Sequence, residues 1–391
     1  MDTKKILFDK ILKSMFSDTV VVKYWDGEEK KYGSGEPKFK LFIGEDIGIS
    51  DVTDDYSVAF GEAYMDGRIK VEGNIEELVE SIYNNKDSFL NKEHKTLKIL
   101  RSGFNRLKKS KQNIEHHYDI GNDFYKLWLD KSMTYSCAYF KEPEDTLEDA
   151  QLHKVEHVLN KLSLKEGQKL LDIGCGWGTL IIKAAKEYGV KCVGITLSKE
   201  QYAETQKKIK DQGLENLVEV RLEDYRELKH EKFDRIVSIG MLEHVGKENL
   251  DGYFKKIDEL LNDNSLSLVH SITGKNDGSY NEWINKYIFP GGYVPGTKEV
   301  ITDIAENNFM VIDLESLRLH YAKTLKCWAA NFEKALDIIR KTKDETFIRM
   351  WRLYLNSCSA SFQVGNIDIQ QILFSKGAVN SLPWTREYME K

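Results

Sequence analysis

Cysteine is scarce in this sequence, with five among 391 residues. The number is odd, and no two cysteines form a C-x-x-C pair. This pattern excludes a disulfide framework and a cysteine-based zinc site. The thiols therefore fit a reducing compartment, and we expect a cytoplasmic protein.

Long apolar runs are absent as well. The N-terminal segment 1–16 carries apolar residues at helical spacing, but Lys5, Asp9 and Lys10 interrupt them, as in an amphipathic helix and unlike a signal peptide. No other apolar run reaches the length of a helix that crosses a bilayer. If the protein acts on a lipid, we expect peripheral association with the inner face of the cell membrane.

The chain also lacks an excess of positive charge, since 57 Lys and Arg stand against 63 Asp and Glu. The net charge of -6 argues against nucleic acid as the main partner. The exception is segment 95–111, which contains Lys and Arg but no acid. It predicts either a plain surface linker or a helix that lies near anionic lipid headgroups.

The length and a hydrophobic content of 41% predict two or three domains. Residues 1–92 predict a smaller α+β domain for lipid binding or dimerisation, with strands around Asp26-Gly27 and a helix capped by Asn74. Residues 93–112 predict a basic linker helix, and residues 113–391 a catalytic domain. From about residue 150 strands alternate with helices, which predicts a doubly wound, Rossmann-like α/β sheet.

A glycine-rich turn, DIGCGWG at residues 172–178, stands where a strand gives way to a helix. Glycines there let the backbone approach a ligand. The spacing is G-x-G-x-G with an acid, Asp172, before the first glycine, which favours S-adenosylmethionine over a dinucleotide. Thr196, Ser198 and Gln201 after the second strand suit a ribose and an amino-acid tail. Beyond the third strand, Glu223 and the adjacent Asp224 suit the adenine amino group.

Several motifs carry a family resemblance. They are IEHHYDIGNDFY (114–125), MTYSCAYF (133–140), DIGCGWG (172–178), GITLSKEQ (194–201), EHVG (243–246), YIFPGGYVPG (287–296) and HYAKTL (320–325). With these motifs the chain resembles the cyclopropane-fatty-acyl-phospholipid synthases and the related mycolic acid cyclopropane synthases. The extra N-terminal domain is similar to that of the phospholipid-acting members. Leu222 stands where some relatives have tryptophan.

The resemblance implies an enzyme that transfers a methylene group from S-adenosylmethionine to the cis double bond of an unsaturated phospholipid acyl chain. The resemblance also implies that the reaction passes through a carbocation that bound bicarbonate deprotonates, and that the product is a cyclopropane. The motifs and the resemblance together predict these cofactor-binding residues: Tyr135, Ser136, Asp172, Gly174, Cys175, Gly176, Thr196, Leu197, Ser198, Gln201, Leu222 and Glu223. The resemblance implies these ion-binding catalytic residues: Cys137, Glu243, His270, Ile272 and Tyr321.

Three alternatives stay open at this point. One is a methyltransferase that acts on an amine or another small molecule and needs no ion site. Another is a lipid-binding protein without activity, and a third is a family member whose product is a methyl branch or a hydroxylated chain. We expect no metal, because Glu243-His244 has no second ligand pair at helical spacing. We also expect a homodimer.

Overall fold

A computed structural model describes residues 3–45, 47, 55–85, 88, 121–278 and 281–390. The chain divides into two compact units. The first comprises Met1–Gly103, Asn281–Pro290 and Leu325–Asn366, and the second comprises Phe104–Tyr280, Gly291–Thr324 and Ile367–Lys391. The predicted basic linker 93–112 and the motif residues 114–120 lie outside the described residues. The roles assigned to the linear ranges stay predictions.

The first unit has a mixed four-stranded sheet in the order β2-β1-β3-β4. Its strands are β1 (Val20–Lys23), β2 (Glu29–Tyr32), β3 (Phe39–Ile43) and β4 (Ile69–Glu72). Its helices are α1 (Thr3–Leu12), α3 (Tyr56–Met65), α4 (Ile75–Asn84), α11 (Glu282–Tyr287), α14 (Leu336–Ile339) and α15 (Glu345–Gln363), with α13 (Arg318–Lys334) shared between the units. The predicted cap is present, since the Asn74 side chain accepts from the Glu77 N–H. The predicted α+β character of the N-terminal part is confirmed.

Gly61 on α3 makes a close contact that no other residue type can make. A Cβ at Gly61 would lie 2.3 Å from Cδ1 of Trp283 on α11. We expect Gly61→Ala to lower the free energy of unfolding by about 1–3 kcal/mol through overpacking, although alanine favours helix. Gly252→Ala in α10 (Leu250–Leu260) is the control, because a Cβ there meets nothing within 4 Å. Urea unfolding should show it unchanged or stabilised by up to about 1 kcal/mol. Equal stabilisation of both variants would contradict the contact.

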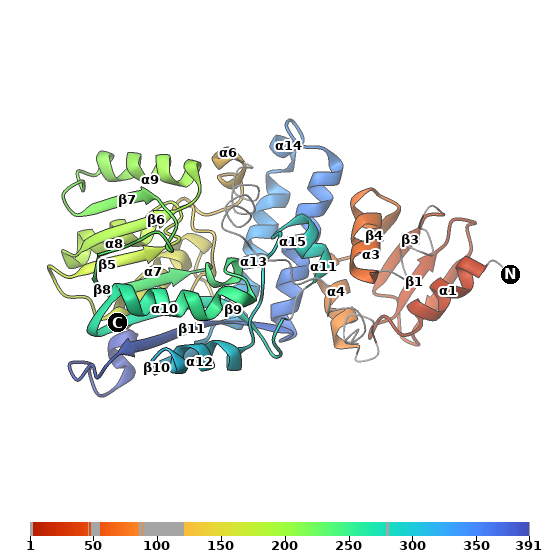
Figure 1. Cartoon of the computed structure of the whole chain (residues 1–391). Helices are drawn as coiled ribbons and strands as arrows, with labels where there is room; N and C mark the ends of the chain where they lie inside the picture. Colours follow the sequence, from red (N-terminus) through yellow and green to blue (C-terminus); the bar gives the residue numbers. More distant parts are fainter. Residues whose placement is uncertain are drawn as a thin grey trace. The chain divides into compact units, whose positions relative to one another are not determined.

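The second unit contains a seven-stranded sheet in the order β10-β11-β9-β8-β5-β6-β7 (Figure 1). Its strands are β5 (Lys169–Ile173), β6 (Lys191–Thr196), β7 (Val218–Leu222), β8 (Phe233–Ile239), β9 (Leu261–Gly274), β10 (Phe309–Ser316) and β11 (Ile367–Lys376). Strands β5 to β9 are parallel, whereas β11 is antiparallel to both β9 and β10. The predicted doubly wound α/β fold is confirmed.

Helices cover both faces of this sheet. One face packs on α7 (Leu147–Leu162), α8 (Thr179–Tyr188) and α9 (Lys199–Asp211), and the other on α10 and α12 (Thr297–Glu306). Successive side chains of β5 alternate between the two cores, with Leu170 in one and Leu171 in the other. Short helices α6 (Asn122–Tyr125), η2 (Leu242–His244), η3 (Lys247–Asn249) and η4 (Arg386–Met389) complete the unit.

The strand order reverses at β5. From β5 the chain continues outward through β6 and β7, and then returns to place β8 on the other side of β5. Ligands of doubly wound sheets bind at such a switch point, outside the carboxyl ends of the strands. The glycine-rich turn follows β5 at this point. Across the described ranges, no helix is both long and apolar enough to span a bilayer.

Candidate active site

The glycine-rich turn uses backbone conformations that suit glycine. Gly174, Gly176 and Gly178 have φ values of 84°, 54° and 79°, in the left-handed region that side chains disfavour. The N–H groups of Gly174 and Cys175 both donate to the carbonyl of Ile195, each at 3.0 Å. These bonds fasten the turn to the end of β6 and leave its glycines at the switch point.

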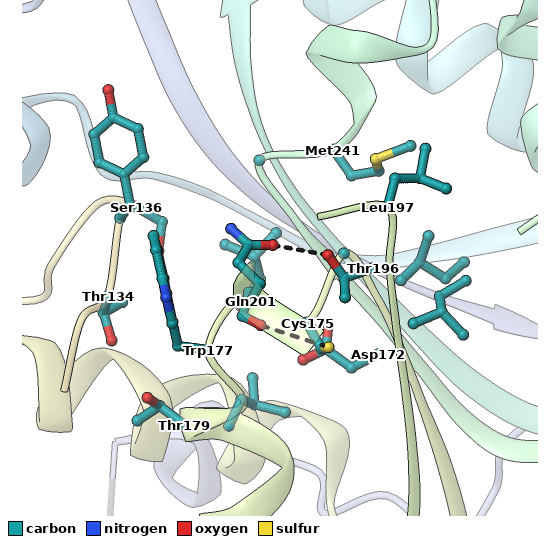
Figure 2. A pocket seen from close by; sticks show the side chains of 18 of the residues that line it. Thr134, Ser136, Asp172, Cys175, Trp177, Thr179, Thr196, Leu197, Gln201 and Met241 are labelled. Carbon is teal, nitrogen blue, oxygen red and sulfur yellow. Dashed lines mark hydrogen bonds between the residues drawn. The ribbon is translucent and has the colours of Figure 1, made fainter. Parts of the chain in front are cut away.

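A pocket lies at this turn and is lined by the carboxyl ends of β5, β6 and β8, the segment after β7 and the segment 133–136 (Figure 2). In this view Ser136 and Trp177 lie on one side, and Leu197 and Met241 on the other. The Thr196 hydroxyl donates to Oε1 of Gln201 at 2.7 Å between them. The pocket therefore gathers backbone, hydroxyl, amide and carboxyl groups from five parts of the chain.

Most of the predicted cofactor residues line this pocket. They are Tyr135, Ser136, Asp172, Gly174, Cys175, Gly176, Thr196, Leu197, Gln201 and Glu223. Ser198 and Leu222 do not line it. Ser198 is buried and caps α9, where its hydroxyl accepts from the Gln201 N–H at 3.3 Å. Leu222 is 40% exposed at the end of β7.

Other lining residues were not predicted from the sequence, among them Lys154, Trp177, Tyr225, Met241 and His244. Trp177 lies inside the glycine-rich turn at residues 172–178. Met241 and His244 follow β8, so the rule that ligands meet strand ends would have found them. Lys154 lies on α7 and carries no signal in the sequence. The pocket is thus wider than the motifs alone indicate.

The two acids after β7, Glu223 and Asp224, differ in their hydrogen-bond and ion-pair partners. Asp224 accepts three hydrogen bonds from Arg226, one from the backbone N–H at 3.0 Å and two from the guanidinium at 2.9 and 2.6 Å. Glu223 has a more distant cation, since Arg221 Nη1 lies 4.0 Å away. Both acids line the pocket. Glu223 is therefore the better placed acceptor for a ligand amino or hydroxyl group.

Glu243 and Ile272, two members of the predicted ion-binding set, are in direct contact. The Ile272 N–H donates to Oε1 of Glu243 at 2.7 Å. The other oxygen, Oε2, is buried and has no hydrogen-bond partner. Burial raises the pKa of Glu243 from its ordinary value to about 7. Met241 and His244, which flank Glu243 along the chain, line the pocket, so this carboxyl lies beside its wall.

His270 lies two residues before Ile272, on the same side of β9. Its side chain is fully buried. Its Nδ1 lies 3.3 Å from Nε2 of Gln371, and its own Nε2 has no partner. Burial holds the pKa of His270 well below its usual value, so the ring is neutral. With the Gln371 amide donating to Nδ1, the proton of the ring is on Nε2, which is a free donor.

Cys137 and Tyr321 share a partner, the backbone carbonyl of Leu317 just before α13. The Cys137 thiol points to the carbonyl of Leu317 at 3.8 Å, and the Tyr321 N–H donates to the same carbonyl. Leu317 in turn donates to the carbonyl of Ile369 on β11, which lies opposite Ile272 on β9. Neighbouring strands are about 4.8 Å apart. The backbones of the five predicted residues are therefore linked through Leu317 and Ile369 over a distance of a few such spacings. Burial raises the pKa of the Cys137 thiol, which is therefore no nucleophile.

The buried carboxyl predicts a pH-dependent stability. Because its pKa is about 7 in the folded protein and 4.5 ordinarily, the folded state binds the proton more tightly, and stability is lost as pH rises from about 4.5 to 7. The Glu243→Gln variant has no carboxyl to ionise at this position, so its stability does not fall in this way. We expect it to equal the wild type near pH 4 and to exceed it by up to about 3 kcal/mol at pH 8. Urea unfolding at both pH values tests this, and a difference that does not change with pH would contradict it.

One group of metal-type ligands occurs among the described residues, at His157, Glu315 and Glu390. Both ring nitrogens of His157 are already occupied, by the Met389 carbonyl at 3.0 Å and by Glu315 at 2.7 Å. Lys161 also donates to Glu315, at 2.5 Å. This network fastens the C-terminal segment to α7 through His157.

Proteins similar to this chain include a probable methyltransferase and cyclopropane synthases. The family described as "Mycolic acid cyclopropane synthetase" matches residues 105–372, and a domain of unknown function matches residues 7–94. A probable fatty acid methyltransferase of Pseudomonas putida is 39% identical, over 94% of this chain and 95% of its own. The cyclopropane-fatty-acyl-phospholipid synthase of Escherichia coli (strain K12) is 42% identical, over 68% and 69%. The crystal structure of the mycolic acid cyclopropane synthase CmaA1 complexed with SAH and CTAB is 36% identical, over 68% and 98%, with a TM-score of 0.65.

Proposed function

The chain belongs to the mycolic acid cyclopropane synthetase family, and on this basis we propose that it transfers a methylene group from S-adenosylmethionine to the cis double bond of an unsaturated phospholipid acyl chain and closes a cyclopropane ring. The general activity, methylene transfer from S-adenosylmethionine of the cyclopropane-synthase type, follows from family membership. The phospholipid substrate and the ion-assisted step are the finer parts of the proposal.

One observation carries the proposal. Two buried polar atoms without partners, Oε2 of Glu243 and Nε2 of His270, belong to residues next to the pocket lining. Glu243 precedes the lining residue His244, and the His270 carbonyl accepts from the N–H of the lining residue Gly240. A buried polar atom left unpaired costs about 1–3 kcal/mol, so a ligand that hydrogen-bonds to both atoms would remove this cost. A methyltransferase acting on an amine has no need of this second site.

Bicarbonate fits this donor and acceptor set. Its hydroxyl can donate to Oε2 of Glu243, which offers only an acceptor when ionised. Its remaining oxygens can accept from the His270 Nε2–H. When bound, bicarbonate supplies a base for the proton that ring closure must release. Glu243 and His270 would hold that base by hydrogen bonds, and the Ile272 N–H holds the Glu243 carboxyl in place.

Aromatic side chains also line the pocket. The ring of buried Tyr125 lies 5.4 Å from that of Tyr135 and 5.6 Å from that of Trp177, and Tyr135 and Trp177 line the pocket. Aromatic faces stabilise a desolvated cation by about 2 kcal/mol, which suits a sulfonium donor and a carbocation on the acyl chain. They also exclude the water that would trap such a cation.

The test is the lipid composition of cells that express this chain from a plasmid. We expect unsaturated phospholipid chains to gain one methylene, with the high-field proton signals of a cyclopropane in the NMR spectrum. Phospholipids that gain a methyl branch instead would favour the reaction suggested by the name of the Pseudomonas putida relative. Unchanged lipids, together with methylation of amines by the purified protein, would contradict the proposal.

We also propose that the basic segment 95–111 attaches the protein to anionic membranes. This segment lies outside the described residues, and the support for the proposal is its run of Lys and Arg without an acid. Each basic residue near an anionic surface contributes about 1 kcal/mol. Charge reversal to Glu at Lys98, Arg101, Lys108 and Lys109 should therefore weaken sedimentation with phosphatidylglycerol vesicles by at least about 100-fold, without changing the affinity for S-adenosylhomocysteine.

A matched control reverses four exposed lysines on or beside α8 and α9: Lys186, Lys199, Lys207 and Lys210. The change in net charge is the same, so a larger loss with the 95–111 variant identifies that segment as the attachment site. Equal losses would leave only a general charge effect.

The homodimer expected from the sequence is a separate prediction, which sedimentation equilibrium of the wild type tests.

A further inference from the structure

Lys154 places an ammonium group deep in the pocket. Its side chain lies on α7, is 2% exposed and lines the pocket. Its Nζ donates to the Ser136 hydroxyl oxygen at 2.9 Å. No other acceptor for it exists in the part of the chain that the structure describes. An ammonium carries three N–H donors, so the others are available to a ligand.

No carboxylate neutralises this ammonium within ion-pair distance among the residues described here. Asp172 is the acid that shares its surroundings, since it is 3% exposed and lines the same pocket. Its carboxyl forms no hydrogen bond with any described residue. Burial lowers the pKa of Lys154 to about 8 and raises that of Asp172 to about 7. An isolated buried charge is costly, so a cation and an anion kept apart in one pocket point to a ligand that carries both charges.

Helix α7 also positions segment 133–136, which lines the pocket. Gln151, one turn before Lys154, donates its amide to the carbonyls of Thr134 and Ser136, at 3.3 and 2.9 Å. Met133, at the start of this segment, has a left-handed φ of 63°. Because the Ser136 oxygen accepts from Lys154, its own O–H is free to donate to a ligand. Lys154 and Ser136 thus present N–H and O–H donors side by side.

We propose that Lys154 recognises the carboxylate of the methionine part of S-adenosylmethionine, directly and through the Ser136 hydroxyl, while Asp172 recognises its ammonium. The amino-acid tail is a zwitterion, and the two buried charges are its complement. The proposal rests on S-adenosylmethionine as the ligand of the proposed function but not on the lipid chemistry, so it is tested without any lipid.

The test compares two ligands by calorimetry. S-adenosylhomocysteine carries the whole zwitterion, and its decarboxylated analogue lacks only the carboxylate. Lys154→Met keeps the aliphatic stem of the side chain and removes the charge. We expect it to weaken S-adenosylhomocysteine binding by about 10- to 100-fold and to leave binding of the decarboxylated analogue unchanged. Asp172→Asn should weaken binding of both ligands, because both carry the ammonium.

Two results would overturn the proposal. Equal losses for both ligands with Lys154→Met would mean that Lys154 only holds segment 133–136 in place. Full affinity of the variant for S-adenosylhomocysteine, or no binding of this ligand to the wild type, would also contradict it. If Lys154→Met does not fold, Ser136→Ala serves as the second variant, with a smaller loss expected for S-adenosylhomocysteine only. Failure of the lipid reaction leaves all of these binding results unaffected, so the two proposals fail separately.

Discussion

Glu243→Gln should reduce methylene transfer to unsaturated phospholipid by at least about 100-fold, with S-adenosylhomocysteine still bound at wild-type affinity. The amide retains an oxygen for the Ile272 N–H but replaces the unpartnered Oε2, an acceptor when the carboxyl is ionised, with a donor. The proposed base would then lose the hydrogen bond that Glu243 offers it. Removing a positioned acid–base contribution typically costs about 10²–10⁴ in rate. Initial rates with vesicle substrate, together with calorimetry, measure both effects.

The control for this variant is Glu248→Gln. Glu248 is an exposed glutamate on the neighbouring helix η3, and it does not line the pocket. We expect its rate and affinity to match those of the wild type. If Glu243→Gln retained its rate within a few-fold, or lost ligand affinity together with its rate, the role given to Glu243 would be wrong. Urea unfolding separates this effect from loss of folding, because this variant is expected to be more stable than the wild type above pH 7.

Gly174→Val should abolish measurable binding of S-adenosylhomocysteine, which we estimate as a loss of more than about 100-fold, or about 3 kcal/mol. Gly174 has a φ of 84°, which a β-branched residue strongly disfavours. A Cβ at this position would lie 3.6 Å from the Met241 side chain, and both residues line the pocket. The added methyl groups would therefore occupy ligand space as well as strain the turn.

Gly213→Val separates strain from occupation of the pocket. Gly213 follows α9, has a similar φ of 65°, and a Cβ there meets nothing within 4 Å. It does not line the pocket. Both variants should lose a few kcal/mol of stability or less from the strained backbone, but only Gly174→Val should lose the ligand. Wild-type affinity in Gly174→Val would show that the turn does not contact the ligand.

The fold of the second unit was predictable because its signals are local. The strand–glycine turn–helix unit at 169–188 and the alternation that follows can be recognised from periodicity and capping residues alone. The cofactor residues follow from the rule that ligands lie at strand ends. The Ser198 hydroxyl shows how one signal can have two readings, since the same hydroxyl type that suits a ligand also suits the cap of α9, which it forms.

Other features depend on contacts between distant parts of the chain, and the sequence carries no local signal for them. Cys137 and Ile272 come together through Leu317 and Ile369, in a ladder that antiparallel β11 completes. Only the family resemblance grouped these residues beforehand. Lys154 could not be predicted either, because a lysine on an amphipathic helix normally faces solvent. Likewise, nothing local assigns Asn281–Pro290 and Leu325–Asn366 to the first unit.

The most direct test of the central claim uses the purified protein, vesicles of a monounsaturated phospholipid and S-adenosylmethionine with a fully deuterated methyl group. The pocket and the adjacent Glu243–His270 pair predict a cyclopropane-containing acyl chain, with one deuteron lost from each transferred methyl. They also predict that removal of bicarbonate from the buffer slows product formation. A product that retains every deuteron, or a rate that does not depend on bicarbonate, would contradict a site built to hold a base beside the methyl donor.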